Sequence, residues 1–195
     1  MDLPILPITL VGSWPRQKSL LKAQKQKRGG KMPRAEFERI ADDHVRRVLA
    51  MQIDAGGDMV TDGEQRRDSF FSFVADKLDG VTMMTLAEML DIIEDKAGFE
   101  QILQTLDVPA YSISNATCTG PIARREPLAV DELRFLKQHT DKPVKVPLPG
   151  PYLLTRGMFV KEVSQPAYAT KEALGEDVVS ILRAEVEELL AAGAS

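Results

Sequence analysis

Short apolar segments alternate with amphipathic segments along the chain, and this alternation restricts the fold more than any other feature. Runs with the composition of buried strands are found at residues 8–12, 58–61, 116–122 and 143–148. Apolar residues recur at helical spacing within 35–55, 130–138 and 172–192, and two further helices are expected on either side of Gly29-Gly30. Residues 68–105 are expected to be helical and irregular by turns. Strands that alternate with helices predict an α/β fold in which helices cover a parallel sheet.

The number of these units leaves two architectures open. The 195 residues hold about four strand–helix units, and the helix at 172–192 precedes a fifth strand that the sequence does not include. A closed (β/α)8 barrel needs eight strands and about 250 residues. The pattern therefore predicts either a small doubly wound sheet or about half of a barrel, and composition does not decide between them.

Charge and apolar content bear on the partners of the protein. The formal net charge is −4, so attraction of the whole molecule to nucleic acid is not expected. No apolar run approaches the roughly 20 residues of a membrane span. The N-terminus also lacks the basic region and cleavage site of a secretory signal. We therefore expect a cytoplasmic protein that binds neither nucleic acid nor a membrane.

Residues of the kinds that bind transition metals are few. The sequence contains one cysteine, Cys118, and two histidines, His44 and His139. A zinc site built from several cysteines or histidines of this chain alone is therefore not expected.

Two motifs are the most specific features of the sequence. The first is Thr-Leu-Val-Gly-Ser-Trp-Pro-Arg at residues 9–16. The second is Ala-Gly-Gly-Asp-Met-Val-Thr-Asp-Gly-Glu-Gln-Arg-Arg at residues 55–67. Both resemble the catalytic domain of the cobalamin-independent methionine synthase family, including its short archaeal-type members. Weaker matches follow at residues 146–151, a Gly-Pro loop after a strand, and at residues 183–193, a helix. The resemblance thus covers essentially the whole chain.

This resemblance implies the N-terminal half of a (β/α)8 TIM barrel, with residues 1–195 forming a single partial domain that ends before the fifth strand. It also implies transfer of a methyl group from a methylated folate to the thiol of homocysteine, a step of methionine biosynthesis. In the family, zinc holds that thiol as a thiolate, which a free thiol with a pKa of about 8.5 rarely is at neutral pH. The family's zinc ligands lie beyond the last residue of this sequence. We therefore assign neither a metal ligand nor a catalytic residue to this half.

Four residues are expected to bind the amino-acid substrate instead. The loop Val11-Gly12-Ser13 offers a backbone N–H and a hydroxyl to the carboxylate, and Gly12 permits close approach. Glu64 can accept hydrogen bonds from the ammonium group. The alternatives are a plain turn that ends a strand for Gly12-Ser13, and a solvated loop acid or helix-cap partner for Glu64.

Three further features near the motifs have two interpretations each. Trp14 is a candidate wall of the substrate site or a packing residue, and Asp62 is a candidate wall or the centre of an Asx turn. Residues 16–34 hold eight basic residues and no acidic one. We interpret that stretch as a solvated pair of helices, although the polyglutamate tail of the family's folate donor is a possible ligand for it.

Two other functions are kept beside the leading one. Relatives of the family act through zinc on other thiols such as coenzyme M, whose sulfonate group gives Glu64 little to bind. The third hypothesis is a non-catalytic truncated half-barrel or pairing module. An open half-barrel exposes strand edges and apolar surface, so a homodimer or a complementary half-barrel chain is then expected.

Overall fold

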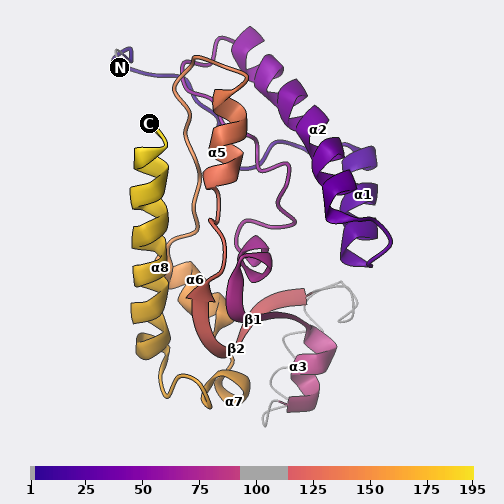
Figure 1. The fold of residues 1–195 in the computed structure, drawn as a ribbon, viewed down its shortest axis with the longest axis vertical. Helices are drawn as coiled ribbons and strands as arrows, with labels where there is room; N and C mark the ends of the chain where they lie inside the picture. The colour runs from indigo at the N-terminus through magenta and orange to yellow at the C-terminus, as the bar shows by residue number, and fades with distance from the viewer. Residues whose placement is uncertain (1–2, 93–113) are drawn as a thin grey trace. The chain divides into compact units, whose positions relative to one another are not determined.

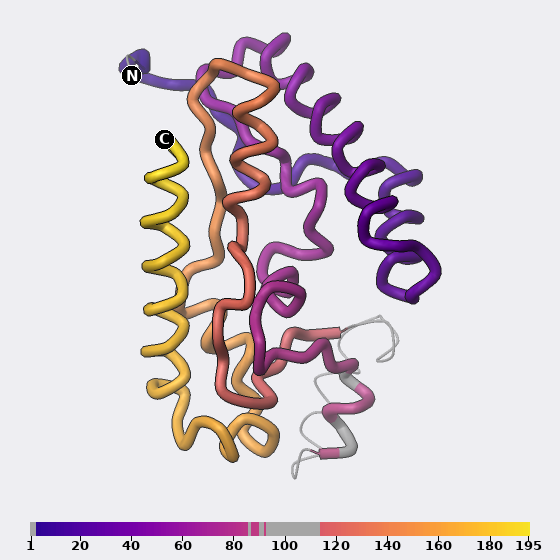
Figure 2. Tube along the Cα trace, viewed as in Figure 1, coloured from indigo at the N-terminus to yellow at the C-terminus, as the bar shows by residue number. Residues whose placement is uncertain are grey.

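The computed structural model describes residues 3–92 and 114–195, which fold into two compact units (Figures 1 and 2). The first unit comprises the residues up to Phe70 together with Ala129–Leu148 and Glu185–Ser195. The second comprises Phe71–Leu128 and Pro149–Ala184. Helix α8, Lys171–Ala191, contributes residues to both units. Each unit has its own apolar core.

The first unit contains three expected helices, α1 (Lys18–Arg28), α2 (Arg34–Asp54) and α5 (Val130–Lys137). Apolar spacing predicted α2 and α5, and the Gly29-Gly30 break predicted α1. The apolar residues of α2 recur every third or fourth position, which places them on one buried face. That face packs against α1 near its start and against α5 farther along, and the side chains buried there are Phe37, Ala41, Val45, Val48 and Leu49. The helix ends before Gly56, whose φ of +83° suits glycine.

Parallel pairing in the first unit is limited to single bridges. Thr9 pairs with Met59, and Val60 pairs with Val144, both in parallel. The Val60 N–H donates to the carbonyl of Pro143 at 2.9 Å, and Val60 in turn accepts from the Lys145 N–H at 2.9 Å. The expected strands at 8–12, 58–61 and 143–148 are therefore neighbours in parallel, as the alternation predicts.

The second unit is built on an antiparallel hairpin. Strands β1 (Leu78–Thr85) and β2 (Ser114–Arg124) form a two-stranded sheet whose register is interrupted at Gly80. Gly80 has a φ of +72°, and a Cβ there would lie 2.2 Å from the carbonyl oxygen of Pro121. Only glycine fits this close approach of the two strands. The unit also contains a 3-10 helix (Ser72–Asp76), α3 (Leu86–Ile92), α6 (Pro151–Met158) and α7 (Lys161–Ser164).

The structure corrects the sequence-based fold in three places. The strand expected at 116–122 exists within β2, but it pairs antiparallel with β1 and does not join the parallel set. The region expected to be helical and irregular from residue 68 contains strand β1. Helices α6 and α7, which follow the expected Gly-Pro loop, were not predicted. The part of that 68–105 expectation from residue 93 onward lies outside the described residues.

No helix in the described ranges is long and apolar enough to cross a membrane.

Candidate functional site

The loop at residues 61–67 follows the middle parallel segment of the first unit and is held by side chains. The amide of Gln52 on α2 donates from Nε2 to the Thr61 carbonyl at 2.8 Å and accepts from the Thr61 N–H at 3.0 Å. Thr61 Oγ1 then accepts from the Gly63 N–H at 3.0 Å, and Asp62 Oδ1 accepts from the Glu64 N–H at 2.9 Å. These bonds fix the backbone of the loop.

Two consecutive residues of this loop have left-handed backbone conformations. The φ of Gly63 is +65° and that of Glu64 is +55°. Glutamate rarely adopts such a conformation, and residues held in it are found preferentially at binding and catalytic sites. The Asp62 carboxylate caps the Glu64 N–H in this conformation, which is the Asx-turn interpretation of Asp62.

The loop that ends the first parallel segment lies directly against this one. The Trp14 N–H donates to the Gly63 carbonyl at 3.0 Å, and the Trp14 carbonyl accepts from Gln65 Nε2 at 2.9 Å. Nη2 of Arg16 donates to the carbonyls of Glu64 and Arg67, each at 2.8 Å. Residues about fifty positions apart in the sequence therefore form one rigid wall.

These two loops and the third parallel segment enclose a cavity of about 550 Å³. The lining residues are Leu10, Val11, Gly12, Ser13, Arg16, Thr61, Glu64, Ser69, Phe70, Lys145 and Pro147. They come from the points where the parallel segments at 8–12, 58–61 and 143–148 end. The carboxyl ends of parallel strands are where α/β folds build their ligand sites.

All four residues expected to bind the amino acid, Val11, Gly12, Ser13 and Glu64, line this one cavity. The two candidate walls do not line it. Trp14 contributes backbone hydrogen bonds to Gly63 and Gln65, and Asp62 is buried, with Oδ2 unpaired among the described residues.

Opposite charges meet at this cavity. Glu64 is only 3% exposed, and no hydrogen bond to its carboxylate is found among the described residues. Burial lowers the pKa of the Arg16 guanidinium, while the carboxylates of Glu64 and Asp62 oppose that shift. Nε of Arg16 is buried without a hydrogen-bond partner in the described part of the chain. The cavity therefore offers an acceptor for a cation and a donor for an anion.

Arg16 and Lys145 were not expected at the site. Nζ of Lys145 donates to the Leu10 carbonyl at 2.6 Å, which fixes it between two of the parallel segments. Arg16 follows the expected strand at 8–12, whereas Lys145 lies within the expected strand at 143–148, and these positions were the available signal. Arg16 was instead grouped with the basic stretch that follows it.

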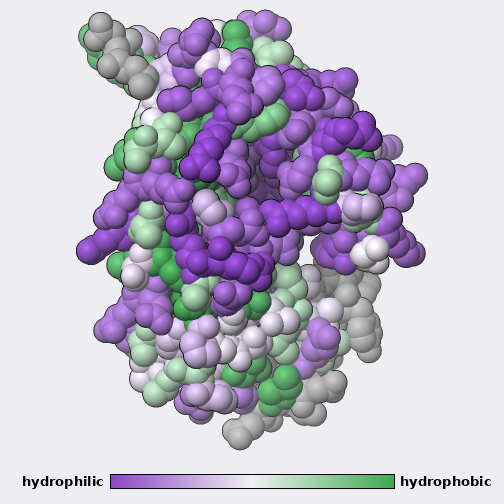
Figure 3. All heavy atoms as spheres, in the orientation of Figure 1, coloured by the Kyte–Doolittle hydropathy of each residue, from purple (hydrophilic) through white to green (hydrophobic). Residues whose placement is uncertain are grey.

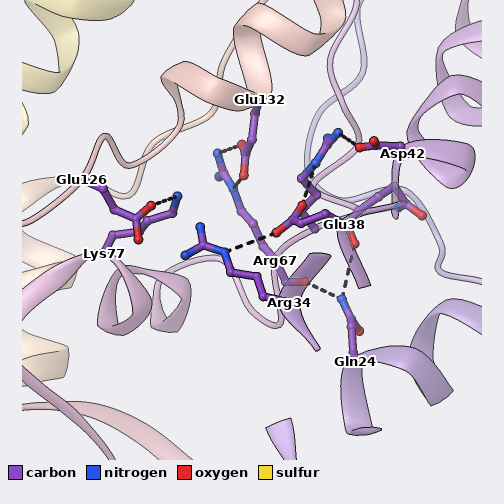
Figure 4. Close-up of polar contacts among 10 residues, drawn as sticks. Gln24, Arg34, Glu38, Asp42, Arg67, Lys77, Glu126 and Glu132 are labelled. Carbon is purple, nitrogen blue, oxygen red and sulfur yellow. Dashed lines mark hydrogen bonds and ion pairs between the residues drawn. The ribbon is translucent and has the colours of Figure 1, made fainter. Parts of the chain in front are cut away.

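Behind the loop lies a buried ion pair (Figure 4). The guanidinium of Arg67 makes two hydrogen bonds to Glu132 of α5, at 3.2 and 2.6 Å, and a third to the Pro147 carbonyl at 2.8 Å. Burial, together with the nearby charge of Asp62, raises the pKa of Glu132 to about 7, although the Arg67 guanidinium opposes both effects. The pair ties the loop to α5 and to the third parallel segment.

Zinc does not fit the described residues. Within residues 3–92 and 114–195, no three side chains of histidine, cysteine, aspartate or glutamate are placed to hold a metal ion.

Comparison with known proteins decides the family. The family model described as the cobalamin-independent synthase catalytic domain matches residues 6–195. The chain belongs to the cobalamin-independent methionine synthase family. The motifs at residues 9–16 and 55–67, which carried the resemblance, contribute nine residues to the cavity and its two loops. Seven of them line the cavity, namely Leu10, Val11, Gly12, Ser13, Arg16, Thr61 and Glu64. Trp14 and Asp62 hold the loops through hydrogen bonds.

Two curated relatives illustrate the range of the family. The 5-methyltetrahydropteroyltriglutamate–homocysteine methyltransferase of Streptomyces griseus is 31% identical over 195 residues, which cover 100% of this chain and 22% of that protein. The methionine synthase of Thermococcus kodakarensis is 29% identical over 196 residues, which cover 100% of this chain and 52% of that protein. The chain thus spans about half the length of the shorter relative.

Solved structures of the family share the α/β fold. The B12-independent methionine synthase from Shewanella sp. W3-18-1, in complex with selenomethionine, matches with a TM-score of 0.68 and 25% identity. The match covers 98% of this chain and 50% of that one. A putative B12-independent methionine synthase from Listeria monocytogenes, 20% identical, matches with the same TM-score of 0.68 and shows the fold alone.

Proposed function

We propose that the cavity binds the amino-acid part of homocysteine and that the protein takes part in methyl transfer from a methylated folate to the homocysteine thiol. The observation that carries the proposal is the placement of Glu64, Ser13 and Arg16 on one cavity. The names of the relatives support it, since one denotes a homocysteine methyltransferase and others denote methionine synthases. The Shewanella structure contains selenomethionine, the selenium analogue of the reaction product.

The charges of the cavity match those of an amino-acid zwitterion. The ammonium group needs an anion with free acceptor oxygens, which the buried Glu64 carboxylate supplies. The carboxylate needs donors, and Ser13 and Arg16, which both line the cavity, carry a hydroxyl and a guanidinium. Charge-assisted hydrogen bonds of this kind are stronger than bonds between neutral groups.

The role proposed for these residues is to bind and orient the substrate. Zinc, which the resemblance implies, would supply the thiolate, but the described residues offer no donor set for it. No step of the reaction is therefore assigned to a metal held by these residues.

The parallel segments are proposed to belong to a (β/α)8 barrel of which residues 1–195 form one partial domain. The support is twofold: the loops after the three segments line one cavity, and the chain matches about half of each solved neighbour. Binding at this end of the strands is typical of that architecture.

Isothermal titration of reduced L-homocysteine into wild-type protein and Glu64→Gln tests the amino-acid site. Glutamine keeps the size of the side chain and removes its charge, so binding is expected to weaken by about 10- to 100-fold. Glu36→Gln, an exposed acid of α2 in the same unit, is the matched control and should bind like the wild type.

Two results would contradict the proposal. One is homocysteine binding that is the same in Glu64→Gln as in the wild type. The other is preferential binding of 2-mercaptoethanesulfonate, a thiol with a sulfonate and no ammonium, which would favour the coenzyme M type of substrate.

A further inference from the structure

Arg67 is a buried cation that lies outside the cavity lining. In Figure 3 hydrophilic colour dominates the surface where Figure 1 places helices α1 and α2. Arg67 is instead only 1% exposed, and its partner Glu132 is 9% exposed. Removing two charges from water is costly, so a buried ion pair stabilises a fold little more than apolar residues of similar size. The importance of this pair is therefore sought in what it holds in place.

The guanidinium of Arg67 connects α5 to the third parallel segment. Nε and Nη2 donate to the two carboxylate oxygens of Glu132, at 3.2 and 2.6 Å, and Nη1 donates to the carbonyl of Pro147 at 2.8 Å. Pro147 lines the cavity. Because the guanidinium is planar and its donors are fixed relative to one another, these three bonds set the position of Pro147 relative to the site loop.

The backbone of Arg67 is bound to two other residues of the cavity lining. Its N–H donates to the Glu64 carbonyl at 3.2 Å, and its carbonyl accepts from Nη2 of Arg16 at 2.8 Å. The same carbonyl accepts from Nε2 of Gln24 on α1 at 2.9 Å (Figure 4). A single residue thus contacts three parts of the cavity lining, namely Glu64, Arg16 and Pro147.

We propose that Arg67 is a positioning residue for the amino-acid site, which holds these three parts of the lining at the spacing that fits homocysteine. This inference rests on the proposed function. Glu64 is the acceptor proposed for the ammonium group and Arg16 a donor proposed for the carboxylate, so their spacing affects both ends of the amino acid. A binding site discriminates between ligands that differ by one methylene only when its walls are held in place.

Arg67→Lys tests the inference, because lysine keeps a positive charge beside Glu132 but lacks the planar fork that also reaches Pro147. Isothermal titration is performed well below the unfolding midpoint of each protein, with reduced L-homocysteine and with L-cysteine, which is one methylene shorter. Homocysteine should bind about tenfold more weakly to Arg67→Lys than to the wild type. The preference for homocysteine over cysteine, expected to be about tenfold or more in the wild type, should fall towards one. A purely structural role would lower the unfolding midpoint and leave both quantities unchanged in the folded protein.

Two further variants complete the test. Arg134→Lys is the matched control, since Arg134 pairs with Asp131 and Glu188, lies outside the cavity lining and should bind both amino acids like the wild type. Arg67→Met/Glu132→Leu removes both charges of the buried pair, which leaves no unpaired charge and preserves the fold, as circular dichroism would show. It should weaken homocysteine binding as Arg67→Lys does. Wild-type binding of both amino acids by the two folded Arg67 variants, or an equal loss in Arg134→Lys, would overturn the inference.

Failure of the proposed function is detected separately, by amide hydrogen exchange in the absence of ligand. The N–H groups of Trp14 and Glu64 are hydrogen-bonded within the wall that Arg67 holds. Both should exchange about tenfold faster in Arg67→Lys and at the wild-type rate in Arg134→Lys, with strand β1 of the second unit as an unchanged reference. If exchange accelerates while wild-type protein binds no homocysteine, the positioning role is supported and the amino-acid site is wrong. If homocysteine binds equally to both proteins and exchange is unchanged, the reverse holds.

Discussion

Gly63→Ala probes the geometry on which the candidate site depends. Gly63 precedes Glu64 in the site loop and has a φ of +65°. A Cβ at this position would lie 2.8 Å from Cγ1 of Val48 and 2.9 Å from Cβ of Trp14. Val48 is buried on α2, and the Trp14 backbone is hydrogen-bonded to residues 63 and 65, so neither can move away freely.

The expected cost has two parts. A left-handed backbone at alanine costs about 1 kcal/mol, and overpacking a filled site costs about 1–3 kcal/mol. The free energy of unfolding of Gly63→Ala should therefore fall by about 2–4 kcal/mol. Gly56→Ala supplies the control, because its φ is +83° and no atom lies within 4 Å of the added Cβ. Only the backbone part applies there, about 1 kcal/mol.

Urea unfolding followed by circular dichroism gives both free energies. The two variants should differ by about 1–3 kcal/mol, with Gly63→Ala the less stable. Equal losses would mean that the contacts around Gly63 relax at no cost and that the site loop is not tightly packed. The steric argument would then be refuted.

Two further predictions concern buried polar groups, one in each unit. The pKa of Glu132 is raised to about 7 in the folded protein, so the folded state binds the proton more tightly than the unfolded chain, whose value is near 4.5. The stability that this group contributes is present below pH 4.5 and is lost as pH rises to 7, by up to about 3 kcal/mol. Between pH 5 and pH 7.5, the free energy of unfolding measured with urea should therefore fall less in Glu132→Gln than in the wild type. An equal fall in the two proteins would contradict this prediction. Tyr168→Phe removes the oxygen that accepts a hydrogen bond from the buried Ile122 N–H at 2.9 Å. The free energy of unfolding, measured by thermal and urea unfolding, should therefore fall by about 1–3 kcal/mol. An unchanged unfolding midpoint would show that this bond does not stabilise the fold.

Local pattern was sufficient for the long helices of the first unit and for its parallel neighbours. The apolar spacing of α2 and the Gly56-Gly57 pair after it mark the helix and its end within the sequence itself. Glu64 and the loop at 11–13 were also predictable, because the two motifs that contain them occur at the ends of expected strands.

What the sequence did not predict depends on distant partners. Strand β1 contains Gly80, which local pattern counts against a strand, but the close approach of Pro121 on β2 requires it. The position of Arg16 in the cavity lining depends on carbonyls 48 and 51 residues away, at Glu64 and Arg67. No window of sequence around Arg16 contains that information.

The amide of Gln52 takes the place that a neighbouring strand would occupy beside Thr61. It satisfies both backbone groups of Thr61 from a helix, at 2.8 and 3.0 Å. Ordering a loop costs about 1–2 kcal/mol per residue in conformational entropy. Because Gln52 already orders this part of the loop in the folded chain, that entropy is lost on folding and not on ligand binding. The shape of the cavity thus depends in part on a residue that lies outside its lining.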